Sequence, residues 1–157
     1  MAGNLKFTSN HNVGKLVRWL RMIGYDTVFF DGRDDAHLVA IALAESRLIL
    51  TRDTQIMQRG IITSERLKAI LINSDEPEAQ IRQVIDTLNL DCQFRPFAIC
   101  LECNQTLEER GQEEIKGRVP PYVFRTQSQY MECPTCHRVY WKGTHWVAMT
   151  QTLNKFC

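Results

Sequence analysis

The chain has 157 residues, of which 44% are hydrophobic and 24% charged, and its formal net charge is +1. That length suits one domain, or one domain with a small appendage, and no apolar run is long enough for a membrane span or a secretory signal. We therefore expect a cytoplasmic protein with no membrane partner, while a nearly neutral net charge by itself identifies no other partner.

The first 90 residues alternate short apolar runs with helical patterns. We expect strands at residues 5–8, 26–30, 48–51 and 67–72, and helices at residues 13–24, 34–46 and 53–59. We expect a fourth helix with Pro77 near its first turn and with Ile81, Val84, Ile85 and Leu88 on one face. Gly24 is a natural C-terminal stop for the first helix. Asp34 or Asp35 can cap the second helix, and Ser74 or Asp75 the fourth. Alternation of this kind predicts an α/β fold with a mostly parallel sheet flanked by helices. The runs LIL and AILI predict strands buried on both faces.

Polar side chains follow every predicted strand. Asn10 follows the first strand, acids follow the second, Asp53 follows the third and Asp75 follows the fourth. Because parallel strands end at one edge of a sheet, these turns should meet there, and clustered carboxylates select Mg²⁺ or Mn²⁺. A plainer reading is that each acid only caps the helix behind it.

No glycine-rich phosphate motif accompanies these turns. The first strand is not followed by GxGxxG, and GxxxxGK[ST] is absent from the sequence. We therefore expect no nucleotide cofactor.

Two CxxC pairs, Cys100–Cys103 and Cys133–Cys136, stand in the last third of the chain with 29 residues between them. This spacing predicts a structural zinc site with four sulfur ligands and extra structure inserted between the pairs. A redox pair is less suitable, since neither CxxC lies at a strand-to-helix turn. We expect the remaining cysteines, Cys92 and Cys157, to be bystanders, and His137 and His145 to lie near the metal or on the surface. Composition changes near residue 92, which divides the chain into residues 1–92, an α/β domain, and residues 93–157, a Cys₄ zinc ribbon.

The motifs GKLVRWLRMIGYDT, DGRDDAHLVAIA, LILTRD, NSDEPEAQI and CLEC with CPTCHRVYWKGTHW together resemble the Mut-seven C-terminal RNase domain family, from Leu5 to Trp146. The resemblance implies a PIN-like fold, that is, a mostly parallel sheet flanked by helices, with an acidic metal site and a small zinc-ribbon module behind it. It also implies a metal-dependent ribonuclease.

The sequence departs from the family at one position. The family's first acid falls on Asn10, and its other acids fall on Asp34 or Asp35, on Asp53 and on the turn with Asp75. An amide offers an oxygen ligand but no negative charge and no base. Our first hypothesis is a ribonuclease in which these residues hold Mg²⁺ or Mn²⁺, and the alternative is a non-catalytic RNA- or ribonucleoprotein-binding module.

Two stretches have a basic excess, residues 1–25 and residues 117–146. They fit a polyanion, although solvated basic faces look the same in sequence. The expected RNA-binding residues are Lys15, Arg18, Arg52, Arg138, Lys142 and Trp141. The plainer reading of the aromatics is packing between ribbon and sheet. A third reading is a protein-interaction module with a partner such as an antitoxin.

Overall fold

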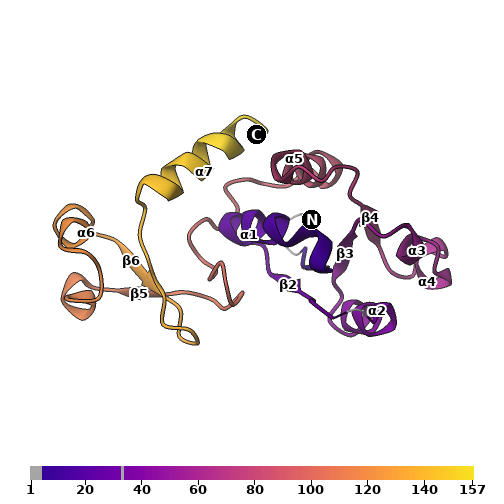
Figure 1. Cartoon of the computed structure of the whole chain (residues 1–157), viewed down its shortest axis with the longest axis horizontal. Coiled ribbons are helices and arrows are strands. Elements are labelled where there is room, and N and C mark those ends of the chain that lie inside the picture. The colour runs from indigo at the N-terminus through magenta and orange to yellow at the C-terminus, as the bar shows by residue number, and fades with distance from the viewer. Residues whose placement is uncertain (1–4, 33) are drawn as a thin grey trace.

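The structure, a computed structural model, describes residues 5–32 and 34–157, and two sheets organise them (Figure 1). The first sheet is parallel, in the order β2-β1-β3-β4, and the second is antiparallel, in the order β5-β6-β7. Their bounds are β1 Phe7–Ser9, β2 Thr27–Phe29, β3 Leu48–Thr51, β4 Ala69–Leu71, β5 Glu108–Arg110, β6 Tyr130–Glu132 and β7 Val139–Tyr140. The predicted fold class is confirmed: an α/β domain with a parallel sheet flanked by helices, plus a small antiparallel sheet beside four clustered cysteines.

Helices connect the strands much as the periodicity predicts. Their bounds are α1 Gly14–Ile23, α2 Asp35–Ala44, α3 Thr54–Met57, α4 Gly60–Thr63, α5 Pro77–Leu88, α6 Pro121–Thr126 and α7 Thr144–Asn154, with 3₁₀ turns at His11–Val13 and Gln112–Ile115. The first helix ends at the predicted stop, since Gly24 has φ 108° and its N–H caps the last turn. Within the two described ranges, no helix is long and apolar enough to cross a membrane.

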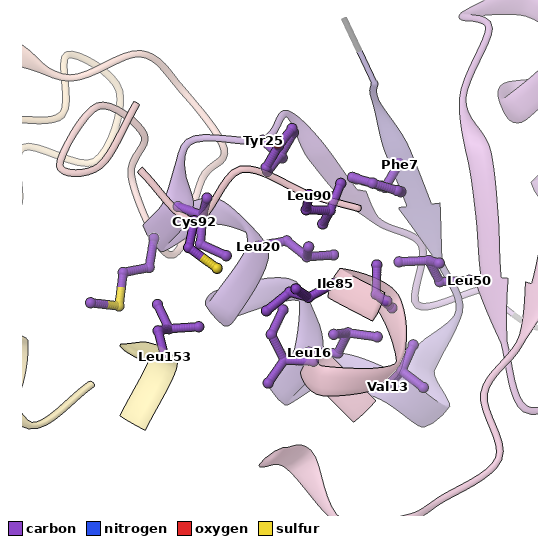
Figure 2. Packing of buried hydrophobic residues seen from close by; sticks show 14 of the residues in the cluster. Phe7, Val13, Leu16, Leu20, Tyr25, Leu50, Ile85, Leu90, Cys92 and Leu153 are labelled. Atoms are coloured by element: carbon purple, nitrogen blue, oxygen red, sulfur yellow. The ribbon is translucent and has the colours of Figure 1, made fainter. Parts of the chain in front are cut away.

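Side chains of β3 alternate between two apolar layers, as the period of a strand requires. Leu48 and Leu50 belong to the larger core, which they form with residues of α1 and α5 (Figure 2). Ile49 belongs to a smaller core with residues of α2, α3 and α4. The sheet is thus covered on both faces. All four residues of β3 are buried, as predicted for LIL.

The prediction that AILI is buried on both sides is wrong. Strand β4 lies at the edge of the sheet, where it pairs with β3, and its three residues are only half-buried. An apolar run shows that a strand has apolar neighbours, but it does not give the position of the strand within the sheet.

The chain beyond residue 92 packs onto the first sheet's core. Helix α7, which the sequence did not predict, runs from the ribbon back towards α5 (Figure 1) and adds Leu153 to the larger core. Cys92 and Cys157 form a disulfide across 65 residues, contrary to the expectation that they are bystanders. The division of the chain at residue 92 stays a prediction.

Asn104 holds the first cysteine knuckle against β2. Its side-chain oxygen accepts the N–H of Thr27 at 2.9 Å, and its Nδ2 donates to the carboxylate of Asp26 at 2.6 Å. The buried guanidinium of Arg47 donates to the same carboxylate at 2.8 Å. Partial burial raises the pKa of Asp26, but the hydrogen bonds from Arg47 and Asn104 outweigh it and hold the pKa below its usual value.

We expect Asn104→Asp to lower the free energy of unfolding by about 1–3 kcal/mol at pH 7, because the donor to Asp26 is lost and two carboxylates face one another. The new carboxyl has a raised pKa in the folded state, so the destabilisation is present at neutral pH and shrinks as the pH falls through that raised pKa. Urea titrations at pH 7 and pH 4 measure the effect. Gln151→Glu, an amide-to-acid change at an exposed position of α7, is the control. A loss independent of pH would contradict the assignment.

Candidate active site and metal centre

The order of the parallel sheet places one crevice between β1 and β3. From β1 the chain crosses to β2 on one side of the sheet, and from β3 it crosses to β4 on the opposite side. The connections that leave β1 and β3 therefore run in opposite directions, which opens a crevice between these two strands. In open α/β sheets, ligands bind at this divergence, beyond the carboxyl ends of the strands.

A pocket of about 300 Å³ lies at this crevice, and Asn10, Asp35 and Asp53 all line it. Asn10 follows β1, Asp53 follows β3 by two residues, and Asp35 is the first residue of α2. His11, Asn12 and Phe30 complete much of the wall. Three of the five predicted catalytic residues therefore share one pocket.

The two neighbouring acids at the start of α2 differ in position. Asp34 is the N-cap, and its Oδ1 accepts the N–H of Ala36 at 3.0 Å, whereas Asp35 lines the pocket. Asp53 has both positions at once: it caps α3 by accepting the N–H of Gln55 at 2.8 Å, and it lines the pocket. A carboxylate has two oxygens, so Asp53 can cap α3 and still offer an oxygen to a metal ion.

The carboxamide of Asn10 is 5% exposed and bonded at both ends. Its Nδ2 donates to the hydroxyl oxygen of Thr51 at 2.9 Å, and its Oδ1 accepts the N–H of Asn12 at 3.3 Å. The Thr51 hydroxyl oxygen also accepts the N–H of Asp53 at 3.0 Å, which joins β1, β3 and the Asp53 turn. Asn10 thus links the ends of β1 and β3 through hydrogen bonds within the pocket wall.

Asp75 is not among the residues that line this pocket. Its turn follows β4, which is two strands away from β1, or roughly 10 Å at the usual spacing between strands. The prediction that Ser74 or Asp75 caps α5 is wrong: the N-cap is Glu76, and the Ser74 hydroxyl accepts the N–H of Glu76 at 3.0 Å.

The four predicted zinc ligands Cys100, Cys103, Cys133 and Cys136 converge, with their sulfur atoms all within 4.8 Å of one another. In residues 5–32 and 34–157 they are the only group of three or more His, Cys, Asp or Glu side chains close enough to hold a metal ion. The Cys100 and Cys136 sulfurs are 3.7 Å apart. A tetrahedron with 2.3 Å Zn–S bonds has edges of about 3.8 Å. The donor set and spacing therefore fit a metal such as zinc.

Hydrogen bonds orient the cysteines. In each knuckle the N–H of the second cysteine donates to the first sulfur at 3.4 Å, and the hydroxyl of Tyr140 lies 3.2 Å from the sulfur of Cys100. Burial raises the pKa of the Cys100 thiol, but the hydrogen bonds from Tyr140 and the backbone lower it to about 7. Thiolates are the form that binds metal, so these bonds favour the metal-binding form of Cys100. In contrast, the hydrogen bond with Cys136 raises the pKa of Cys103 to about 12, and burial raises the pKa of Cys136.

An ion-pair network that the sequence did not predict lies behind the second knuckle. Glu132 of β6 accepts from both terminal nitrogens of Arg118 at 3.0 and 3.1 Å, from Arg110 at 3.0 Å and faces His137 at 3.1 Å. Arg118, followed by His137 and Arg110, lowers the pKa of Glu132 to about 2. The members of this network are spread over residues 110–137 and give no local signal, so spacing could not have identified it.

The predicted RNA-binding residues do not all line one pocket. Arg18, Arg138 and Trp141 line one pocket between α1 and the ribbon. Lys142 lies over the ring of Phe97 with its Nζ at 5.4 Å, and Lys15 is exposed on α1. One terminal nitrogen of Arg52 is buried without a hydrogen-bond partner in the described chain.

The basic helix face is smaller than its sequence implies. Arg21 is buried and donates to the carbonyl oxygens of Thr27 at 3.0 Å and Leu101 at 2.8 Å, so it joins β2 to the ribbon and is removed from solvent.

Comparisons with known proteins give one match. Residues 5–153 match the sequence model of a family described as the Mut7-C RNAse domain. None of the curated proteins and none of the solved structures matches the chain.

Proposed function

This chain belongs to the Mut7-C RNAse domain family, which suggests a nuclease-like role, and from that membership we propose that it is a metal-dependent ribonuclease. The reaction is hydrolysis of an RNA phosphodiester bond in the pocket between β1 and β3. We call this pocket, defined by Asn10, Asp35 and Asp53, the acidic pocket.

The observation that carries the proposal is the convergence of three separate turns on one crevice. Two carboxylates and an amide from residues far apart in sequence line the same 300 Å³. Helix capping alone explains Asp34, whose Oδ1 accepts the N–H of Ala36, but it does not explain why Asp35 and Asp53, from two separate parts of the chain, line the same pocket as Asn10.

The donor set fits a hard cation. Mg²⁺ is commonly held by one or two carboxylates, with waters and substrate phosphate completing its shell, and Asp35 and Asp53 supply that number. Mg²⁺ or Mn²⁺, when bound, supplies a water of lowered pKa and a positive charge beside the phosphate. Lys15 and Arg52 add positive charge near α1 and β3, which attracts the RNA backbone.

Asn10 positions its neighbours in this proposal. By donating to Thr51, whose hydroxyl accepts the N–H of Asp53, it fixes the turn that carries the second carboxylate. It contributes no charge, so the pocket holds a cation more weakly than one with three acids would.

The test is a cleavage assay on labelled single-stranded and hairpin RNA, with the zinc-loaded chain and with Mg²⁺, Mn²⁺ or no added metal. We expect cleavage that requires the added metal. Failure of the wild type to cut either RNA in either metal would overturn the proposal.

The second candidate, a non-catalytic RNA- or ribonucleoprotein-binding module, is favoured by one observation. Both ends of the Asn10 amide are already hydrogen-bonded within the protein, so this residue has a structural role. A silent wild type beside an active Asn10→Asp variant would select this candidate.

We expect Asn10→Asp to bind Mn²⁺ at least tenfold more tightly than the wild type, because a third carboxylate joins the acidic pocket. The Thr51 hydroxyl can donate its proton to the new carboxylate, so the link between β1 and β3 is retained. Without metal, three close acids repel one another and the melting temperature falls. Thermal melts across a Mn²⁺ titration measure both effects, and an unchanged Mn²⁺ dependence would contradict the assignment of this pocket.

A further inference from the structure

The ribbon meets the helices α1 and α7 in a second, larger hollow. A cavity of about 420 Å³ has three arginines, a histidine and Glu102 in its wall, and Glu102 forms an ion pair with Arg18. This cavity adjoins one of about 230 Å³ with mainly apolar walls. The two share Arg18, Val139, Tyr140 and Trp141, so they form one continuous feature, which we call the ribbon groove. Resting on the proposed nuclease function, we propose that the ribbon groove binds one unpaired nucleotide of the RNA, with phosphate in the cationic part and base in the aromatic part.

The cationic part is set up for a phosphate. Arg118 is held by Glu132 through two hydrogen bonds and by the carbonyl oxygen of His137 at 3.1 Å, so its guanidinium is fixed in place. Arg138 forms no ion pair with any residue that the structure describes, and it lines the same cavity. A fixed arginine beside an uncompensated one suits an anion, because little ordering is needed when the anion binds.

The aromatic part has rings that are already immobilised. Trp141 packs against the ribbon core around Tyr130 and lies over Gly143, where a Cβ would come within 2.8 Å of the indole nitrogen. Trp146 meets Phe97 edge to face at 4.8 Å. Five further members of the YWKGTHW segment besides Trp141, all except Lys142, line this part. Fixed aromatic rings are the usual platform for unpaired bases.

The groove is connected to the acidic pocket along α1. Arg18 lies four residues after Gly14, on the same side of the helix and about 6 Å further along its axis. A Cβ added at Gly14 would lie 3.5 Å from the ring of Phe29. Phe29 is 38% exposed at the end of β2 and is followed in the chain by Phe30, which lines the acidic pocket. An RNA strand with one nucleotide in the groove can pass over Phe29 to the acidic pocket.

The pairing of the two parts favours RNA over an acidic peptide. A peptide carboxylate would use the arginines, but nothing in its chemistry requires rigid stacking rings beside them. Duplex RNA keeps its bases stacked inside the helix, so it cannot insert one into the aromatic part. We therefore expect a preference for single strands.

The test measures binding, separately from cleavage. The full zinc-loaded chain carrying Asp53→Asn is titrated against a fluorescent single-stranded RNA 12-mer, the matching duplex and a poly-glutamate peptide. Arg138→Gln should weaken single-strand binding about tenfold. It should also reduce the slope of log affinity against log salt concentration by about one, which corresponds to the loss of one phosphate contact. Its matched control is Arg125→Gln, an exposed arginine of α6, which should change neither.

The base is tested with an aromatic pair. Trp141→Ala should weaken single-strand binding about five- to a hundredfold, while Tyr122→Ala, which removes a ring 68% exposed on α6, should not. Zinc content and the melting temperature show whether Trp141→Ala is folded, and Arg138→Gln tests the groove independently. Wild-type affinity in Arg138→Gln, or equal competition by poly-glutamate, would overturn the proposal. Single-strand binding that depends on the groove, without cleavage by the wild type, would overturn the nuclease and leave the groove standing.

Discussion

Asp53→Asn will reduce metal-dependent RNA cleavage at least about 100-fold while leaving the fold intact. The asparagine oxygen can still accept the N–H of Gln55, so the cap of α3 is kept, and only the charge and one metal ligand are lost. The measurement is kcat/KM on labelled RNA at saturating Mn²⁺, with the melting temperature recorded alongside.

Two further variants make this result specific. Asp86→Asn removes an exposed acid in the last turn of α5 that does not line the acidic pocket, and it should retain wild-type cleavage. Asp75→Asn tests whether the turn after β4 takes part at all, since that residue does not line the pocket. Equal activity of Asp53→Asn and wild type would show that the acidic pocket is not where RNA is cut.

Removal of the metal from the cysteine cluster will unfold the ribbon. Its strands are two or three residues long, and the core beside the metal is formed by cysteines together with Leu107 and a few half-buried side chains. Metal binding supplies roughly 10–16 kcal/mol in comparable zinc-finger peptides, far more than this core can replace. We expect one zinc per chain by elemental analysis, and loss of hydrogen-exchange protection across residues 99–140 on chelation.

The matched control is another cysteine. Cys103→Ser should lose zinc and ribbon protection together, whereas Cys157→Ser removes a sulfur outside the cluster and should keep one zinc per chain. Full exchange protection in the chelated protein would contradict a structural role for the metal.

The features that could be predicted from sequence are those set by near neighbours in the chain. LILT is a strand with the predicted bounds because a short apolar run that includes β-branched Ile49 and Thr51 fills a site buried on both faces. The helix before Gly24 ends there because only glycine readily adopts φ 108°. The four sulfurs converge because each CxxC turn offers two ligands from one knuckle.

The features that escaped prediction depend on the order of elements in space. Asp75 follows a strand like the other acids, but β4 is an edge strand, and the sequence carries no mark of strand order. The choice between Asp34 and Asp35 depends on which residue begins α2, and a shift of one residue reverses it. The pairing of Cys92 with Cys157 joins positions 65 residues apart and was equally hidden.

Helix α7 attaches the C-terminal end of the ribbon to the core of the first sheet. The chain contributes Cys92 and Leu101 to the larger core, continues through the rest of the ribbon, and returns to add Leu153 to the same core. Phe156 follows, beneath the guanidinium of Arg82 on α5, at 5.9 Å. The zinc module is therefore inserted between two segments that pack into the same core, and the Cys92–Cys157 disulfide joins these segments. Loss of zinc then frees the far end of the ribbon, whereas its two ends stay attached through Leu153 in the core and the Cys92–Cys157 disulfide.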